Sequence, residues 1–201
     1  TPEPLELQAV FSEMVDSGCE YVVMEASSQA LAQGRLYGEH FAGCIFTNLT
    51  EDHLDYHKTK ENYFLAKRML LENSDVAVVN ADDEAGVRLL KEQPCKAVGF
   101  SLEGKADYTA QNVKLSVGGV SYFAEFYNKA YFVKFPMAGE YNVKNSLGVL
   151  ALLNELGFDA KEIINGLLEC SGVRGRSEII PTNRDFTIIC DFAHTPDALR
   201  K

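Results

Sequence analysis

Residues 44–83 decide the fold of this protein, and they read CIFTNLTEDHLDYHKTKENYFLAKRMLLENSDVAVVNADD. A short, partly β-branched apolar run stands at each end, and residues 61–73 between them carry apolar side chains at helical spacing. A third run of the same kind, YVVMEAS, occupies residues 21–27. Apolar runs that alternate with helices are typical of strands in a buried parallel sheet. The sequence therefore predicts an α/β protein with a mostly parallel sheet flanked by helices.

Polar side chains stand at the ends of these three predicted strands. In open α/β sheets the ligand crevice lies beyond the carboxyl ends of the strands, so we expect these side chains to meet at one edge of the sheet. They are Glu25 and Ser27 in the first run, Thr47 and Asn48 in the second, and Asn80 and Asp82 in the third.

The rest of the chain predicts more helices and a second kind of sheet. Between residues 94 and 136 the pattern changes to alternation broken by glycine, and Gly118 with Gly119 predicts a hairpin turn. A further strand after Asn128 completes a small antiparallel β meander. Helices are also predicted at 5–17, 140–157 and 159–170, and a strand at 186–193.

The composition predicts a soluble globular protein. Of the 201 residues 46% are hydrophobic, which is enough to bury a substantial core. The net charge of −10 argues against non-specific nucleic-acid binding, which needs a basic surface. Five scattered cysteines without a Cys-x-x-Cys pair predict free thiols in a reducing compartment. No apolar run approaches the ~20 residues that span a bilayer, so we expect a cytoplasmic protein without a membrane partner.

Two of the four histidines lie close together behind the predicted strand at 44–50. His53 and His57, with Asp52 and Asp55, offer imidazole and carboxylate ligands for a divalent metal. An ordinary polar loop with helix-capping aspartates also explains the same residues, and spacing alone favours it. A metal-dependent hydrolase built on His53, Asp55 and His57 is a further interpretation.

Glu25 and Lys67 are the other candidates for chemistry. An ionised carboxylate such as Glu25 at a strand end is costly to bury unless a cation or several donors meet it, although it can also be a simple exposed acid. Lys67 falls on or beside the inner face of a predicted helix, where an amine must find an anion, lose its proton or be modified. Carbamylation would make it an oxygen ligand for Mg²⁺. The alternative is a lysine whose amine reaches solvent.

Six segments, spread over nearly the whole chain, resemble motifs of one family. They read MEASSQALAQGR, FTNLTEDHLDYHKTKENYFLAK, VVNADD, GEYNVKNSLGVLA, GVRGRSE and DFAHTPDAL. In this order they closely resemble the Mur ligases, and among these the kind that adds the third amino acid of the peptidoglycan stem. The resemblance implies an ATP-dependent acid–amino-acid ligase with Mg²⁺ as cofactor. Its implied substrates are UDP-N-acetylmuramoyl-L-alanyl-D-glutamate and either lysine or meso-diaminopimelate, and a monomer is expected.

The resemblance also assigns roles to single residues. Glu25 and His53 match magnesium ligands, and Lys67 matches a lysine that is carbamylated in the family and joins them. His53 and Lys67 are accordingly the expected catalytic residues. The residues implied at the UDP-muramoyl dipeptide are Thr1, Ser27, Gln33 and Arg35, and those implied around ATP are Asn48, Asn142, Arg176, Asp191 and His194, with Thr195 alongside.

The chain departs from the family by one large absence and at a few single positions. It contains no Gly-x-x-x-x-Gly-Lys-Ser/Thr phosphate loop, so we expect residues 1–180 to be the central, ATP-binding domain without its first strand and that loop. Residues 181–201 are then the start of a C-terminal Rossmann-like ligase domain. Lys58 stands where the family commonly has glycine.

Two other functions fit the same residues. One is a different ATP-dependent ligase of the superfamily, such as folylpolyglutamate synthase. The other is a catalytically inert binding module, because without a phosphate loop the chain alone is expected to lack activity.

Overall fold

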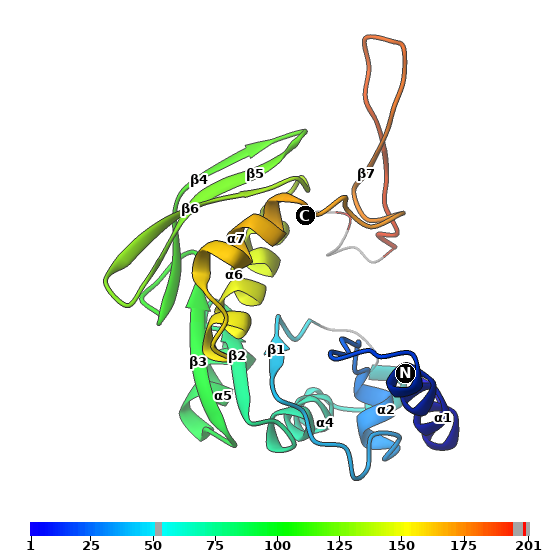
Figure 1. Cartoon of the computed structure of the whole chain (residues 1–201). Helices are drawn as coiled ribbons and strands as arrows, with labels where there is room; N and C mark the ends of the chain where they lie inside the picture. Colours follow the sequence, from blue (N-terminus) through cyan, green and yellow to red (C-terminus); the bar gives the residue numbers. More distant parts are fainter. Residues whose placement is uncertain (51–53, 195–198, 200–201) are drawn as a thin grey trace.

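The computed structural model describes residues 1–50, 54–194 and 199. Helices and strands alternate through the first half, as the sequence predicts, and Figure 1 shows their arrangement. The helices are α1 Pro4–Asp16, α2 Ser28–Ala32, α3 Leu54–His57, α4 Lys60–Glu72, α5 Glu84–Glu92, α6 Glu140–Glu155 and α7 Ala160–Leu168. The strands are β1 Cys44–Phe46, β2 Val76–Asn80, β3 Lys96–Ser101, β4 Tyr108–Ser116, β5 Gly119–Phe126, β6 Lys129–Phe135, β7 Glu178–Ile180 and β8 Ile188–Cys190.

The main sheet has six strands in the order β1-β2-β3-β4-β5-β6. Neighbours from β1 to β4 run parallel, and β4-β5-β6 form the predicted antiparallel meander. The predicted fold class is therefore confirmed, and the meander extends the parallel sheet instead of forming a layer of its own. Strands β7 and β8 pair antiparallel in a separate two-stranded sheet. The strand predicted at 186–193 is therefore confirmed, but it spans only Ile188–Cys190.

Alternate residues of β2 face different helices, because successive side chains in a strand point to opposite sides of the sheet. Val78 belongs to the cluster that α6 makes with the meander, together with Phe100 and Leu147. Ala77 and Val79 belong to a second cluster with side chains of α4 and α5. All five residues of β2 are buried, which explains why its sequence is a continuous apolar run without alternation.

The prediction of a strand at residues 21–27 is wrong. None of these residues lies in a strand, and the side chains of Tyr21 and Val23 are 72% and 97% exposed. A strand forms only where another chain segment completes its backbone hydrogen bonds, and this segment pairs with none of the strands in the described part of the chain. Its β-branched composition correctly indicated strand propensity, but propensity does not supply a partner.

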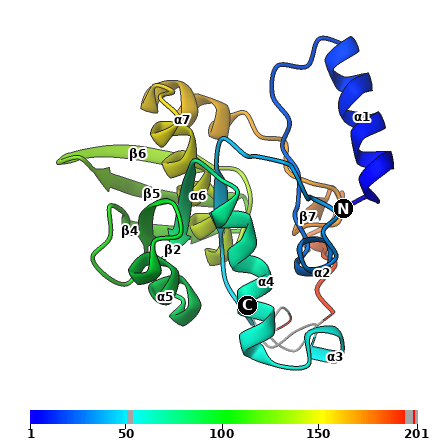
Figure 2. The same ribbon diagram turned by 90° about the horizontal axis from the view of Figure 1, so that it is seen from below.

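The N-terminal segment packs as a small unit beyond β1. Leu7 of α1 meets Leu31 of α2 and Leu36 in a separate apolar cluster. Figures 1 and 2 both place α1 and α2 at the opposite end of the molecule from the meander. The helix predicted at 5–17 is confirmed, and Gly18 follows its end in the left-handed conformation at φ +79°.

Helices α6 and α7 begin and end close to their predicted positions. Gly139 precedes α6 at φ +100°, a conformation that a side chain would strain. Asp159 caps α7 by accepting hydrogen bonds from the backbone N–H groups of Lys161 and Glu162. Among the described residues, no helix is both long and apolar enough to cross a membrane.

Candidate functional site

A cavity of about 920 Å³ lies between the carboxyl end of β1, the N-terminus of α6 and the segment that includes β8. Four of the five residues that the sequence assigned to ATP line it, so the structure brings together side chains that are up to about 140 positions apart in the chain. They are Asn48, Asn142, Arg176 and Asp191.

The wall formed by α6 is held by amide side chains. Asn142, only 3% exposed, donates from Nδ2 to the carbonyl oxygen of Ala138 at 2.7 Å, in the segment just before the helix. Asn145 donates in turn to Oδ1 of Asn142 at 3.3 Å. Both side chains line the cavity next to the N-terminal end of α6, where backbone N–H groups favour negatively charged ligands.

The opposite wall combines a carboxylate with a guanidinium. Asp191 accepts hydrogen bonds from the backbone N–H groups of Ser177 and Ala193, each at 2.7 Å. These donors, the Ser177 N–H first, together with the nearby charge of Arg176, hold the pKa of Asp191 below its usual range. The Arg176 guanidinium lies 5.2 Å from the ring centre of Phe192. The Asp191 carboxylate thus holds the turn that carries the Arg176 guanidinium.

His194, the fifth residue assigned to ATP, does not line the cavity, although its neighbour Ala193 does. Its Nδ1 donates to the carbonyl oxygen of Phe192 at 3.0 Å, and the two rings meet edge to face. Thr195 lies outside the described residues.

The four residues assigned to the muramoyl dipeptide lie together at the start of the chain. Thr1 Oγ1 accepts from the Ser27 N–H at 3.2 Å, and Arg35 donates to the Thr1 carbonyl oxygen at 3.1 Å. The Arg35 side chain also donates to Gln33 at 2.8 Å and pairs with Glu3 at 3.0 Å. Ser27 caps α2 by accepting from the Ala30 N–H, so it has a structural role in addition to any role in binding.

The three residues assigned to magnesium are only partly described. Glu25 is exposed in the segment just before α2, and its carbonyl oxygen accepts a hydrogen bond from Thr1 at 3.0 Å. Lys67 is half-buried on α4, with Nζ 5.3 Å from the ring centre of Tyr63 and 6.0 Å from that of Phe46. His53 lies outside the described residues, and within those described no group of three acidic, histidine or cysteine side chains forms a metal site.

His57 has a contact that the sequence did not reveal. Its Nε2 lies 2.9 Å from Oγ of Ser28, and its ring stacks on Tyr63. His57 is 5% exposed and Ser28 is 4% exposed. The imidazole therefore joins the start of α2, beside Ser27, to the helix that carries Lys67. The motif spacing showed only that His57 was near His53.

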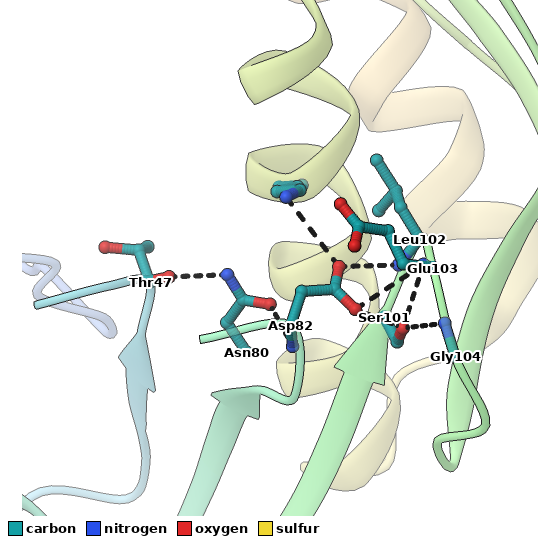
Figure 3. Close-up of polar contacts among 8 residues, drawn as sticks. Thr47, Asn80, Asp82, Ser101, Leu102, Glu103 and Gly104 are labelled. Atoms are coloured by element: carbon teal, nitrogen blue, oxygen red, sulfur yellow. Dashed lines mark hydrogen bonds and ion pairs between the residues drawn. The ribbon is translucent and has the colours of Figure 1, made fainter. Parts of the chain in front are cut away.

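Polar side chains at the ends of β2 and β3 form the network drawn in Figure 3. Asn80 donates to the carbonyl oxygen of Thr47 at 2.7 Å, which confirms that the endings of two predicted strands meet at one edge. Asp82 accepts from the Leu102 N–H at 2.9 Å and contacts the Ser101 hydroxyl. Its carboxylate also lies 3.7 Å from Nζ of Lys144 on α6.

Comparison with known proteins identifies the family. Residues 1–153 match the Mur ligase middle domain. The chain belongs to the Mur ligase family. The UDP-N-acetylmuramoyl-L-alanyl-D-glutamate--2,6-diaminopimelate ligase of Clostridium tetani is 46% identical over 202 residues, which are 99% of this chain and 41% of that protein.

Solved structures of ligases share the fold of this chain. A structure of a UDP-N-acetylmuramoyl-L-alanyl-D-glutamate--2,6-diaminopimelate ligase superposes with a TM-score of 0.86 and 32% identity, over 99% of this chain and 42% of that one. MurF ligase from Thermotoga maritima, solved with ADP, shares the fold with a TM-score of 0.69 and 18% identity, over 87% of this chain and 40% of that one. The chain thus spans about two fifths of the length of the relatives that it matches.

Proposed function

We propose that the complete ligase containing this chain adds 2,6-diaminopimelate to UDP-N-acetylmuramoyl-L-alanyl-D-glutamate at the expense of ATP. The names of the similar proteins support this acceptor over lysine. Residues 1–180 are the central, ATP-binding domain and residues 181–201 begin the C-terminal domain. We place the enzyme in the cytoplasm as a monomer.

The reaction proceeds in two steps. A free carboxylate of the dipeptide attacks the γ-phosphorus of ATP, which forms an acyl phosphate and releases ADP. The amine of 2,6-diaminopimelate then attacks the acyl carbon, and inorganic phosphate leaves as the amide bond forms. The protein itself forms no covalent bond in these steps. It binds and orients the substrates and neutralises their charges.

The cavity beside α6 is the proposed ATP site. Asn48 and Asn142 supply amide groups there, and Arg176 supplies a positive charge for phosphate. Asp191 keeps the Arg176 turn in place through the Ser177 N–H, so the cation need not be reorganised when the nucleotide binds. This gathering of residues in one cavity is the observation that carries the proposal.

The cluster around Thr1 is the proposed dipeptide site. Arg35 is already oriented by the Thr1 carbonyl oxygen and by Gln33, and its guanidinium suits a carboxylate or a phosphate of the substrate. Glu3 pairs with Arg35 in the structure, so we expect an anionic substrate to compete with Glu3 for that cation.

Glu25, His53 and the carbamate of Lys67 would hold Mg²⁺. The exposed Glu25 carboxylate suits this hard cation, whereas a lysine amine becomes an oxygen ligand only after it takes up carbon dioxide. Bound Mg²⁺ offsets the repulsion between the substrate carboxylate and the triphosphate. The Lys67 amine lies within cation–π distance of the rings of Tyr63 and Phe46.

Phosphate release by the full-length ligase tests the reaction. We expect release to require ATP, the muramoyl dipeptide and 2,6-diaminopimelate together, with a tripeptide product detected by mass spectrometry. Extension of a folate by glutamate would instead support the folylpolyglutamate synthase alternative. Phosphate release that proceeds at the same rate without the amino acid would contradict the proposed ligation.

Replacing Lys67 tests the carbamate. We expect Lys67→Ala and Lys67→Arg each to lower ligation by at least about 100-fold, because neither side chain can form a carbamate that binds Mg²⁺. High bicarbonate should restore neither variant. Lys91→Ala, at an exposed position of α5, is the matched control and should retain activity. Full activity in Lys67→Arg would show that a positive charge is sufficient and would refute the carbamate.

A further inference from the structure

We infer that Asn80 and Asp83 are positioning residues that fix Asn48 in the wall of the nucleotide site. This inference rests on the proposed function, because it takes the cavity lined by Asn48 as the ATP site. The sequence showed Asn80 as the polar end of a strand, and it placed Asp83 only within the motif VVNADD.

The chain around Asn48 is held on both sides by side chains from the end of β2. Asn80 Nδ2 donates to the carbonyl oxygen of Thr47 at 2.7 Å, as Figure 3 shows. Asp83 Oδ2 accepts from the backbone N–H of Leu49 at 3.2 Å. The residues immediately before and after Asn48 are therefore tied to the same turn, beyond the point where β1 and β2 stop pairing.

The turn that provides these two contacts is itself well fixed. Asn80 is 5% exposed, and its Oδ1 accepts from the Asp82 N–H at 3.0 Å. Asp83 uses its other oxygen, Oδ1, to cap α5 through the N–H groups of Ala85 and Gly86. A Cβ on Gly86 would lie 1.9 Å from the Asn80 carbonyl oxygen, so α5 begins in close contact with the turn.

The same turn also contacts the wall of the cavity that α6 forms. The Asp82 carboxylate lies 3.7 Å from the Lys144 amine, and Lys144 is on α6 between Asn142 and Asn145, which line the cavity. Residues 80–83 thus contact both the Asn48 segment and α6. A ligand that uses both walls needs their spacing to be correct before it binds, because binding groups that are held in place lose less entropy.

Two substitutions separate this role from simple stabilisation. Asn80→Asp keeps the size of the side chain but sets a carboxylate oxygen against the Thr47 carbonyl oxygen. Asp83→Ser keeps an oxygen to cap α5 but lacks the second oxygen that reaches Leu49. Asp159→Ser, at the cap of α7, is the matched control, because it makes the same change at a cap residue that does not line the nucleotide cavity.

The measurement is made on the full-length ligase, with the non-hydrolysable analogue AMP-PNP and Mg²⁺ for binding and ATP for turnover. We expect each of the two variants to raise the Kd for AMP-PNP and the KM for ATP by about 10-fold or more. The KM for the muramoyl dipeptide should stay within about twofold, and Asp159→Ser should change none of these constants.

The outcomes distinguish the inference from the function on which it rests. If the unmodified ligase does not bind AMP-PNP, the proposed function fails. If it binds and both variants bind equally well, the positioning role is wrong, even if their melting temperatures fall. Should Asn80→Asp not fold, Asp83→Ser decides alone, because it retains the helix cap.

Discussion

The packed centre of the molecule, residues 76–168, differs from the segments that flank it, residues 1–40 and 171–194. In the centre, Leu147 and Leu150 of α6 are completely buried against the sheet. In the flanks, large apolar side chains such as Leu5 and Val23 are 87% and 97% exposed. The proposed dipeptide cluster and the Arg176 wall of the cavity both lie in these flanking segments.

This difference shows that the binding groups come from two kinds of structure, the packed scaffold and the less tightly packed segments beside it. Apolar burial fixes the sheet and α6, and the side chains of Asn48 and Asn142 project from that scaffold. Arg35 and Arg176, by contrast, depend on a few hydrogen bonds between short polar segments. Such segments open locally at little cost and can adjust to a ligand.

The largest expected effect tests the packed centre. Leu150→Ala should lower the free energy of unfolding by about 3 kcal/mol, because it leaves a cavity in the cluster beneath α6. Leu5→Ala, on the exposed side of α1, should change it by less than about 0.5 kcal/mol. Urea unfolding followed by circular dichroism measures both, and equal losses would contradict the division between centre and flanks.

An intermediate effect compares one helix cap from each region. Asp159→Ala should cost about 1 kcal/mol of stability without changing the KM for the muramoyl dipeptide, because α7 is part of the packed centre. Ser27→Ala should cost less stability but raise that KM, because Ser27 belongs to the cluster around Thr1 and Arg35. Thermal unfolding and steady-state kinetics of the full-length ligase measure the two effects. Lost stability with an unchanged KM in Ser27→Ala would show that Ser27 acts only as a cap.

The smallest effect concerns Lys58, which has a left-handed backbone at φ +67° between α3 and α4. Lys58→Gly should raise the free energy of unfolding by roughly 0.5 kcal/mol, because glycine adopts this conformation without the steric cost that a lysine pays. Lys91→Gly, within α5, should lower it by about 1 kcal/mol. Chemical denaturation gives both values. A loss of stability in Lys58→Gly would show that the hydrogen bond from the Lys58 amine to the Asp55 carbonyl oxygen is worth more than the strain.

Predictions from the sequence succeeded where the structure depends on residues close together in the chain, and failed where it depends on distant ones. The predicted helices at 61–73 and 159–170 formed as α4 and α7, since helical spacing and capping residues act within a few positions. The segment 21–27 failed as a strand because strand pairing depends on a neighbour that propensity cannot identify. Strand order predicted that Asn80 and Thr47 would lie at one edge of the sheet, but not their hydrogen bond. The contact of His57 with Ser28 joins residues 29 positions apart, and spacing alone could not predict it.

The sequence by itself determined the fold class, the order of most elements and, through its motifs, the family. Those features follow from local periodicity, turn residues and the order of short motifs along the chain. Only the tertiary structure decided that Asn48, Asn142, Arg176 and Asp191 line one cavity, and that the turn at residues 80–83 holds the chain on both sides of Asn48. The physical reason is that a site is made of distances between distant parts of the chain, and those distances are fixed only when the sheet and α6 pack together.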